Sequence, residues 1–317
     1  MGRFVAIDSP AVDALVADAV AKVGAAVDAL SVPRLAGVVL GGGYGRGEGG
    51  VFTDSSGGEH PYNDLDFYVV AEEGTTDDEL AAINRALDPL SKEWTARTGV
   101  DVDFCPAKTP WRIRHDQERL MIQELIHGYV DVAGKKGEEL FKGVDRRGPD
   151  AFPWTEAVRL LVNRGVGLVL ARQCDDPGFV ARNINKCALG AGDAALIARH
   201  AYAWRTEDRA NALGSAEYRA AVDWKFRPGP EAPLTWEAAR GLWLAAAEEV
   251  RKAGRGERSA GRSLWQAARW IVRRRTVGDI STLGQEAVVR IFKRLTHVIE
   301  AGGPLTDELR KDWIVFN

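Results

Sequence analysis

The spacing of apolar residues predicts that the chain opens with an amphipathic helix followed by a buried strand. Valine and leucine recur every three or four positions from residue 12 to residue 30, and Ser9 and Pro10 are suited to the start of a helix. Pro33 is suited to the residues beyond its end. The unbroken apolar run at residues 35–40 is typical of a buried strand.

Glycine and then polar residues separate this strand from the next one. Residues 41–50 read GGGYGRGEGG, and residues 52–62 are rich in Gly, Ser, Asp and Pro, which predicts a surface loop. Asp64 and Asp66 come next and lead directly into the apolar residues 67–70. Because side chains alternate along a strand, we expect both carboxylates on the same side of the second strand.

The spacing continues to alternate between helix and strand. Thr75 or Thr76 can cap a helix that ends near residue 98, and residues 100–104 alternate apolar and acidic residues as in a strand with one wet face. Apolar positions between residues 115 and 132 predict one further helix. The pattern therefore indicates an α/β first half.

Glycine, proline and charge interrupt the chain at residues 146–154, where we place a domain boundary. Beyond it the two-residue alternation largely stops and helical spacing takes over. The expected helices cover residues 158–172, 180–204, 216–226, 235–253, 264–275 and 286–301. We therefore predict a first domain over residues 1–148 and an all-helical second domain over residues 149–317.

Composition limits the kind of partner and compartment. The 317 residues are 45% hydrophobic and 27% charged, with a net charge of −3, which argues against whole-surface attraction to nucleic acid or anionic membrane. Three widely spaced cysteines support neither a disulfide framework nor a zinc site. No apolar signal core and no run of roughly 18 apolar residues is present. We expect a cytoplasmic protein with no membrane segment.

The glycines and the acids together indicate phosphate chemistry on a metal. Glycine lets the backbone turn sharply after the first strand and leaves N–H groups open to an anion. Asp64 and Asp66, held close together, repel each other unless a cation lies between them. Carboxylate oxygens are ligands that Mg²⁺ prefers, and Mg²⁺ commonly accompanies phosphate.

This order of elements resembles the nucleotidyltransferase superfamily with a catalytic domain like that of DNA polymerase β. The match covers roughly residues 34–105 and joins three separate features. They are the turn Gly42-Gly43-Tyr44-Gly45-Arg46-Gly47, the pair Asp64-Leu65-Asp66, and a third acidic strand with Asp103 or Asp101. Two departures are Gly43, where many members have serine, and the long segment between the turn and Asp64.

The resemblance implies an α+β protein, in which a mixed sheet with flanking helices is followed by an all-α substrate-binding domain like that of aminoglycoside nucleotidyltransferases. It implies transfer of a nucleoside monophosphate, AMP being expected, from its triphosphate to a hydroxyl of a small molecule or a protein. Two Mg²⁺ ions would be held by Asp64, Asp66 and Asp103, and Asp103 could also act as a base.

The resemblance further assigns the nucleotide phosphates to the turn and to the helical domain. Gly42, Gly43, Arg46 and Gly47 would contact the triphosphate. Relatives often send a lysine from the helical domain to it, which makes Lys186 a candidate, although a solvated surface lysine fits the sequence equally well.

Other interpretations remain open at this level. Residues 45–50 also satisfy GxGxxG, so a Rossmann-type NAD(P)-binding oxidoreductase competes, and Gly43 permits a nucleotide-binding regulatory module without catalysis. Arginines and tryptophans alternate over residues 262–275, where a buried stripe is favoured over nucleic-acid binding. Glu48 is expected to be an exposed loop charge.

Overall fold

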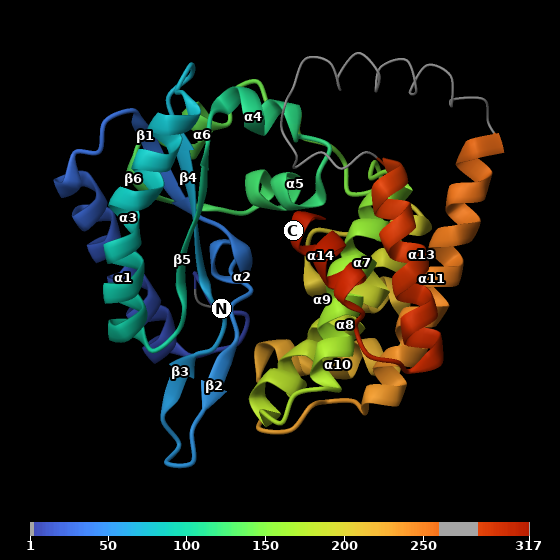
Figure 1. Ribbon diagram of the computed structural model, residues 1–317. Coiled ribbons are helices and arrows are strands. Elements are labelled where there is room, and N and C mark those ends of the chain that lie inside the picture. Colours follow the sequence, from blue (N-terminus) through green and yellow to red (C-terminus); the bar gives the residue numbers. More distant parts are fainter. Residues whose placement is uncertain (1–2, 260–284, 317) are drawn as a thin grey trace. The chain divides into compact units, whose positions relative to one another are not determined.

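The computed structural model describes residues 3–259 and 285–316 (Figure 1). Two compact units are present, one made of residues 1–148 with 225–229 and the other of residues 149–224 with 230–317. The first contains a mixed sheet with helices, and the second is largely helical in its described part. The predicted α+β class is confirmed at this level. The expected helix at residues 264–275 lies outside the described residues.

A four-stranded sheet forms the centre of the first unit, in the order β5-β4-β1-β6 (Figure 1). Its strands are β1 (Leu35–Leu40), β4 (Leu65–Ala71), β5 (Val102–Lys108) and β6 (Val130–Gly134). Strand β1 pairs antiparallel with both β4 and β6, whereas β4 and β5 run parallel. The sheet is therefore mixed, and its parallel pair carries the acidic residues.

Two long helices cover one face of this sheet, α1 (Pro10–Leu30) and α3 (Asp77–Thr98) (Figure 1). Alternate residues of β4, including Phe67, pack into the core that they share. Each helix begins at a predicted cap: the Ser9 hydroxyl accepts from the Val12 N–H, and Thr76 forms a capping box with Glu79. Both predicted helices are confirmed.

Short helices cover the opposite face: α4 (Pro110–His115), α5 (Leu120–His127) and α6 (Gly137–Leu140). They pack a second apolar cluster against Val39 and Val70 of the sheet. The prediction of one helix over residues 115–132 is wrong. Gly128 has an extended backbone that ends α5, and Val130 then pairs with Leu40 as the start of β6. The apolar residues of β6 happen to continue the three- and four-residue spacing of α5, which is why the sequence predicted a single helix.

The segment 52–62 is also not a simple loop. It contains most of a small hairpin, β2 (Val51–Thr53) and β3 (Glu59–Pro61), closed by a turn at residues 54–58. Its strands are three residues long, too short for the alternation to stand out from the polar turn. The same unit contains the single helical turn α2 (Gly42–Gly45) between β1 and β2.

The described part of the second unit is built of helices. They are α7 (Trp154–Ala171), α8 (Pro177–Ala198), α9 (Thr206–Leu213), α10 (Ala216–Phe226, of which the last two residues belong to the first unit), α11 (Trp236–Ser259), α13 (Gln285–Ala301) and α14 (Asp307–Phe316). Trp243 is fully buried, and its ring N–H donates to the Leu161 carbonyl at 2.9 Å, which ties α11 to α7. The predicted helix 180–204 ends early, since α8 stops at Ala198, and α14 was not predicted.

None of the helices in the described part of the chain is long and apolar enough to cross a membrane.

Candidate functional site

The glycine turn after β1 lies directly against the second carboxylate of the acidic pair. Gly42 has φ +61°, which L side chains rarely adopt, and a Cβ there would lie 2.1 Å from Asp66 Oδ2. The Gly41 N–H donates to the Asp66 carbonyl at 2.9 Å. This hydrogen bond ties the turn to strand β4. The backbone conformation favours glycine at position 42, and a side chain there would have to displace the Asp66 carboxylate.

The register of the parallel pair brings the third acidic position beside Asp66. Asp66 of β4 pairs with Asp103 of β5, and Tyr68 pairs with Cys105 two residues later. Paired residues of neighbouring strands project to the same face about 4.8 Å apart. Two predicted acids that lie 37 positions apart in the sequence thus become neighbours.

Electrostatics on this face follow from the pairing. Burial raises the pKa of Cys105 to about 12, and the carboxylates of Asp66 and Asp103 add to the rise. Burial also raises the pKa of Tyr68, with further contributions from Cys105 and Asp66. A concentration of negative charge is therefore present on this face, as a site for a cation requires.

Asp64 and Asp101 lie at the start of the same two strands. Asp64 is exposed and precedes β4 by one residue, and the Leu65 N–H donates to the Asp101 carbonyl at 2.8 Å. Asp101 is exposed and lies one residue before β5. The register therefore distinguishes the two acids of the third strand, because Asp103 and not Asp101 is the partner of Asp66.

A buried tyrosine holds the chain between the glycine turn and the acidic strand. The Tyr44 hydroxyl donates to the Gly50 carbonyl at 2.8 Å and accepts from the Tyr62 N–H at 2.9 Å. The long insertion is thus attached at both ends. Burial raises the pKa of Tyr44 to about 12, so its hydroxyl stays protonated and keeps the donor role.

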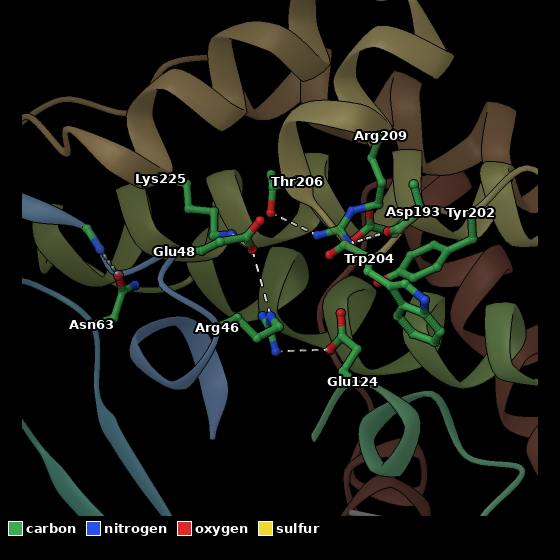
Figure 2. Close-up of polar contacts among 12 residues, drawn as sticks. Arg46, Glu48, Asn63, Glu124, Asp193, Tyr202, Trp204, Thr206, Arg209 and Lys225 are labelled. Carbon is green, nitrogen blue, oxygen red and sulfur yellow. Dashed lines mark hydrogen bonds and ion pairs between the residues drawn. The ribbon is translucent and has the colours of Figure 1, made fainter. Parts of the chain in front are cut away.

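Charged side chains around the turn form ion pairs that include residues missed by sequence reasoning. Arg46 lies 3.7 Å from Glu48 and 3.6 Å from Glu124 of α5, and Lys225 donates to Glu48 at 3.2 Å (Figure 2). Glu48 is buried, so its prediction as an exposed loop charge is wrong. Lys225 belongs to the first unit although it lies 177 residues beyond Glu48, a separation that no local motif reveals.

The candidates of the second unit are not placed in this site. Lys186 is an exposed residue of α8, and its assignment to the triphosphate stays a prediction. Asp193 of the same helix accepts from Tyr218 at 2.5 Å and forms an ion pair with Arg209, whose Nε lies 2.9 Å away. It is thus part of a hydrogen-bonded network inside the helical unit.

In the described ranges, no group of three or more His, Cys, Asp or Glu side chains is arranged to hold a metal ion. Asp66 and Asp103 are paired across neighbouring strands, and Asp64 precedes Asp66 by two residues in the sequence. Mg²⁺ is usually held by one or two carboxylates together with substrate phosphates and water. The donor set of this pair fits that mode of binding.

No protein-family model, curated protein or solved structure matches the chain. The resemblance to nucleotidyltransferases therefore depends on the turn, the acidic pair and the third acidic strand themselves.

Proposed function

We propose that this protein is a Mg²⁺-dependent nucleotidyltransferase. It would move a nucleoside monophosphate, with AMP as our first choice, from the triphosphate to a hydroxyl of a small molecule or a protein. The observation that carries the proposal is the pairing of Asp66 with Asp103 beside Gly42. Two carboxylates on one sheet face, one of them beside a glycine, suit a phosphate-bound cation.

The proposed reaction would use these positions as follows. The acceptor oxygen attacks the α-phosphorus, a new P–O bond forms, and the bond to the β-phosphate breaks with its electron pair leaving on pyrophosphate. Asp66 and Asp103 would hold Mg²⁺, with Asp64 at the open start of β4. Bound Mg²⁺ supplies charge neutralisation on the phosphate oxygens and activation of the attacking oxygen. Asp103, which is exposed, is the group that would accept the hydroxyl proton.

Release of pyrophosphate tests the reaction. The protein is incubated with Mg²⁺, each nucleoside triphosphate and a panel of hydroxyl acceptors, and pyrophosphate is measured enzymatically. We expect release by the wild type and a fall of at least about 100-fold in Asp64→Asn and Asp66→Asn, because charge stabilisation of a phosphoryl transition state is lost. Unchanged release in both variants would show that the acids are assigned wrongly.

The competing functions have different signatures. A regulatory nucleotide-binding module would be stabilised by ATP with Mg²⁺ yet form no product with any acceptor. A Rossmann oxidoreductase would be stabilised by NAD(H) without Mg²⁺. A Rossmann site usually needs a parallel strand before the glycine turn and a long helix after it. Here β1 is antiparallel to both of its neighbours, and the glycines enter a single helical turn.

A further inference from the structure

We propose that Glu48 positions Arg46 and Lys225 as a two-cation surface for the polyphosphate of the nucleotide. Residues 225–229 would then complete a site whose other parts lie before residue 149. The inference rests on the proposed function, because it adds residues to the same nucleotide site. Glu48 is a positioning residue in this account, and Lys225 is a binding residue.

The first observation is that both cations reach the same atom. Arg46 Nε lies 3.7 Å and Lys225 Nζ 3.2 Å from Glu48 Oε2 (Figure 2). The side chains are only 17% exposed for Arg46, 11% for Glu48 and 15% for Lys225. Charges removed from water to this extent are costly unless they are paired, so Glu48 fixes where both cations lie.

The second observation is that the backbone at Lys225 is fitted to the glycine-rich segment. A Cβ at Gly50 would lie 2.5 Å from the Lys225 carbonyl oxygen and 2.8 Å from Asn63 Oδ1. The Gly50 N–H donates to that same Asn63 oxygen at 2.7 Å. The Lys225 backbone therefore lies in close contact with Gly50, two residues beyond Glu48, and only glycine leaves room for this approach.

The third observation concerns the position of the pair relative to the acids. Arg46 is the C-cap residue of α2, the turn whose Gly42 lies against Asp66. A triphosphate on a cation at Asp66 would place negative oxygens within reach of this turn. A guanidinium has five N–H donors and an ammonium three, so each can bind phosphate oxygens while it remains on Glu48.

Glu124 explains why Glu48 is needed. Arg46 also lies 3.6 Å from Glu124 Oε2, so a second carboxylate attracts it towards α5. Without the charge of Glu48, Arg46 would keep Glu124 as an anionic partner, and Lys225 would lose its ion pair with Glu48. The two cations would then separate, and the polyphosphate would lose a paired contact.

Binding of inorganic tripolyphosphate and of ATP, each with Mg²⁺, tests the inference on the full chain by calorimetry. We expect Glu48→Gln and Lys225→Met each to weaken both ligands about tenfold, as the loss of a charge-assisted hydrogen bond predicts. Lys225→Arg should recover most of the affinity. Lys22→Met is the matched control, since Lys22 is an exposed lysine paired with Asp18 on α1. This variant should bind both ligands with the affinity of the wild type.

Kinetics separate positioning from a purely structural role. In Glu48→Gln we expect the KM for ATP to rise about tenfold with a smaller change in kcat. Equal or tighter tripolyphosphate binding by a folded Glu48→Gln protein would overturn the inference. If Glu48 only neutralised the two cations, its negative charge would repel the ligand, and its removal would not weaken binding. Thermal unfolding of every variant is recorded alongside.

A measurement on the wild type covers the case in which a variant fails to fold. Lysines are acetylated with an N-hydroxysuccinimide ester, and modification of Lys225 and Lys22 is followed by mass spectrometry. Saturating tripolyphosphate with Mg²⁺ should slow acetylation of Lys225 and leave Lys22 unaffected. Equal rates at Lys225 with and without ligand would contradict the inference. Wild type that binds neither ligand would instead refute the proposed function.

Discussion

Gly42 is the residue at which the backbone and the candidate site depend on each other most directly. Gly42→Ala must adopt φ +61° and place a methyl group 2.1 Å from Asp66 Oδ2. We expect a loss of about 2–5 kcal/mol in the free energy of unfolding, from the left-handed backbone and from overpacking together. Denaturant unfolding measures it.

Gly99→Ala is the matched control for this change. Gly99 has φ +74°, but nothing lies within 4 Å of a Cβ there. Gly99→Ala should therefore lower the free energy of unfolding by only about 1–2 kcal/mol, which is the contribution of the left-handed backbone. Equal losses in the two variants would mean that the Asp66 carboxylate moves aside for the methyl group at little cost, so that its position is not fixed by the turn.

Cys105 reports on the charge of the two acids beside it. Its pKa is raised to about 12 by burial and by Asp66 and Asp103, so at pH 9 only a small fraction is thiolate. Asp103→Asn removes one of these charges and lowers the pKa, and the alkylation rate of Cys105 at pH 9 should rise about two- to tenfold. An unchanged rate, measured by iodoacetamide labelling and mass spectrometry, would place Asp103 away from Cys105.

At the scale of elements, caps and apolar runs in the sequence correctly predicted where individual helices begin and where a strand lies. Ser9 and Thr76 fix the starts of α1 and α3, and the apolar run of β1 fixes a strand. The pairing of Asp66 with Asp103 is not a local property, since it depends on which strands become neighbours and in which register. The same holds for Lys225, whose contact with Glu48 no sequence window contains.

Helices α8, α9 and α10 are joined by one buried cation. Arg209 of α9 is 4% exposed, lies 2.9 Å from Asp193 and donates to Tyr202 and Thr206 (Figure 2). Asp193 in turn accepts from Tyr218 of α10. Arg209→Met leaves a carboxylate without its charge partner, and we expect a loss of about 3–5 kcal/mol in the free energy of unfolding.

Arg219→Met serves as the matched control. Arg219 forms an ion pair with Glu207, and both side chains are more than a third exposed. Arg219→Met should lower the free energy of unfolding by at most about 1 kcal/mol, because solvent screens an exposed ion pair. Chemical denaturation followed by circular dichroism compares the two variants, and similar losses would contradict the structural role given to Arg209.

At the scale of the whole molecule, each unit contributes differently to the account. The first unit contains the glycine turn, the acidic pair and the segment 225–229, so the proposed binding of a nucleotide can be tested without knowledge of the acceptor. The second unit is helical and contains Lys186, whose predicted contact with the triphosphate remains a prediction.

Mg²⁺-dependent binding of ATP, measured by titration calorimetry, tests the central claim most directly. Asp103→Asn is compared with Asp101→Asn, two exposed acids of one segment that differ in register with Asp66. We predict binding by the wild type only with Mg²⁺, loss of at least about tenfold in affinity in Asp66→Asn and Asp103→Asn, and little change in Asp101→Asn. Equal binding without Mg²⁺, or equal effects at positions 101 and 103, would contradict the account.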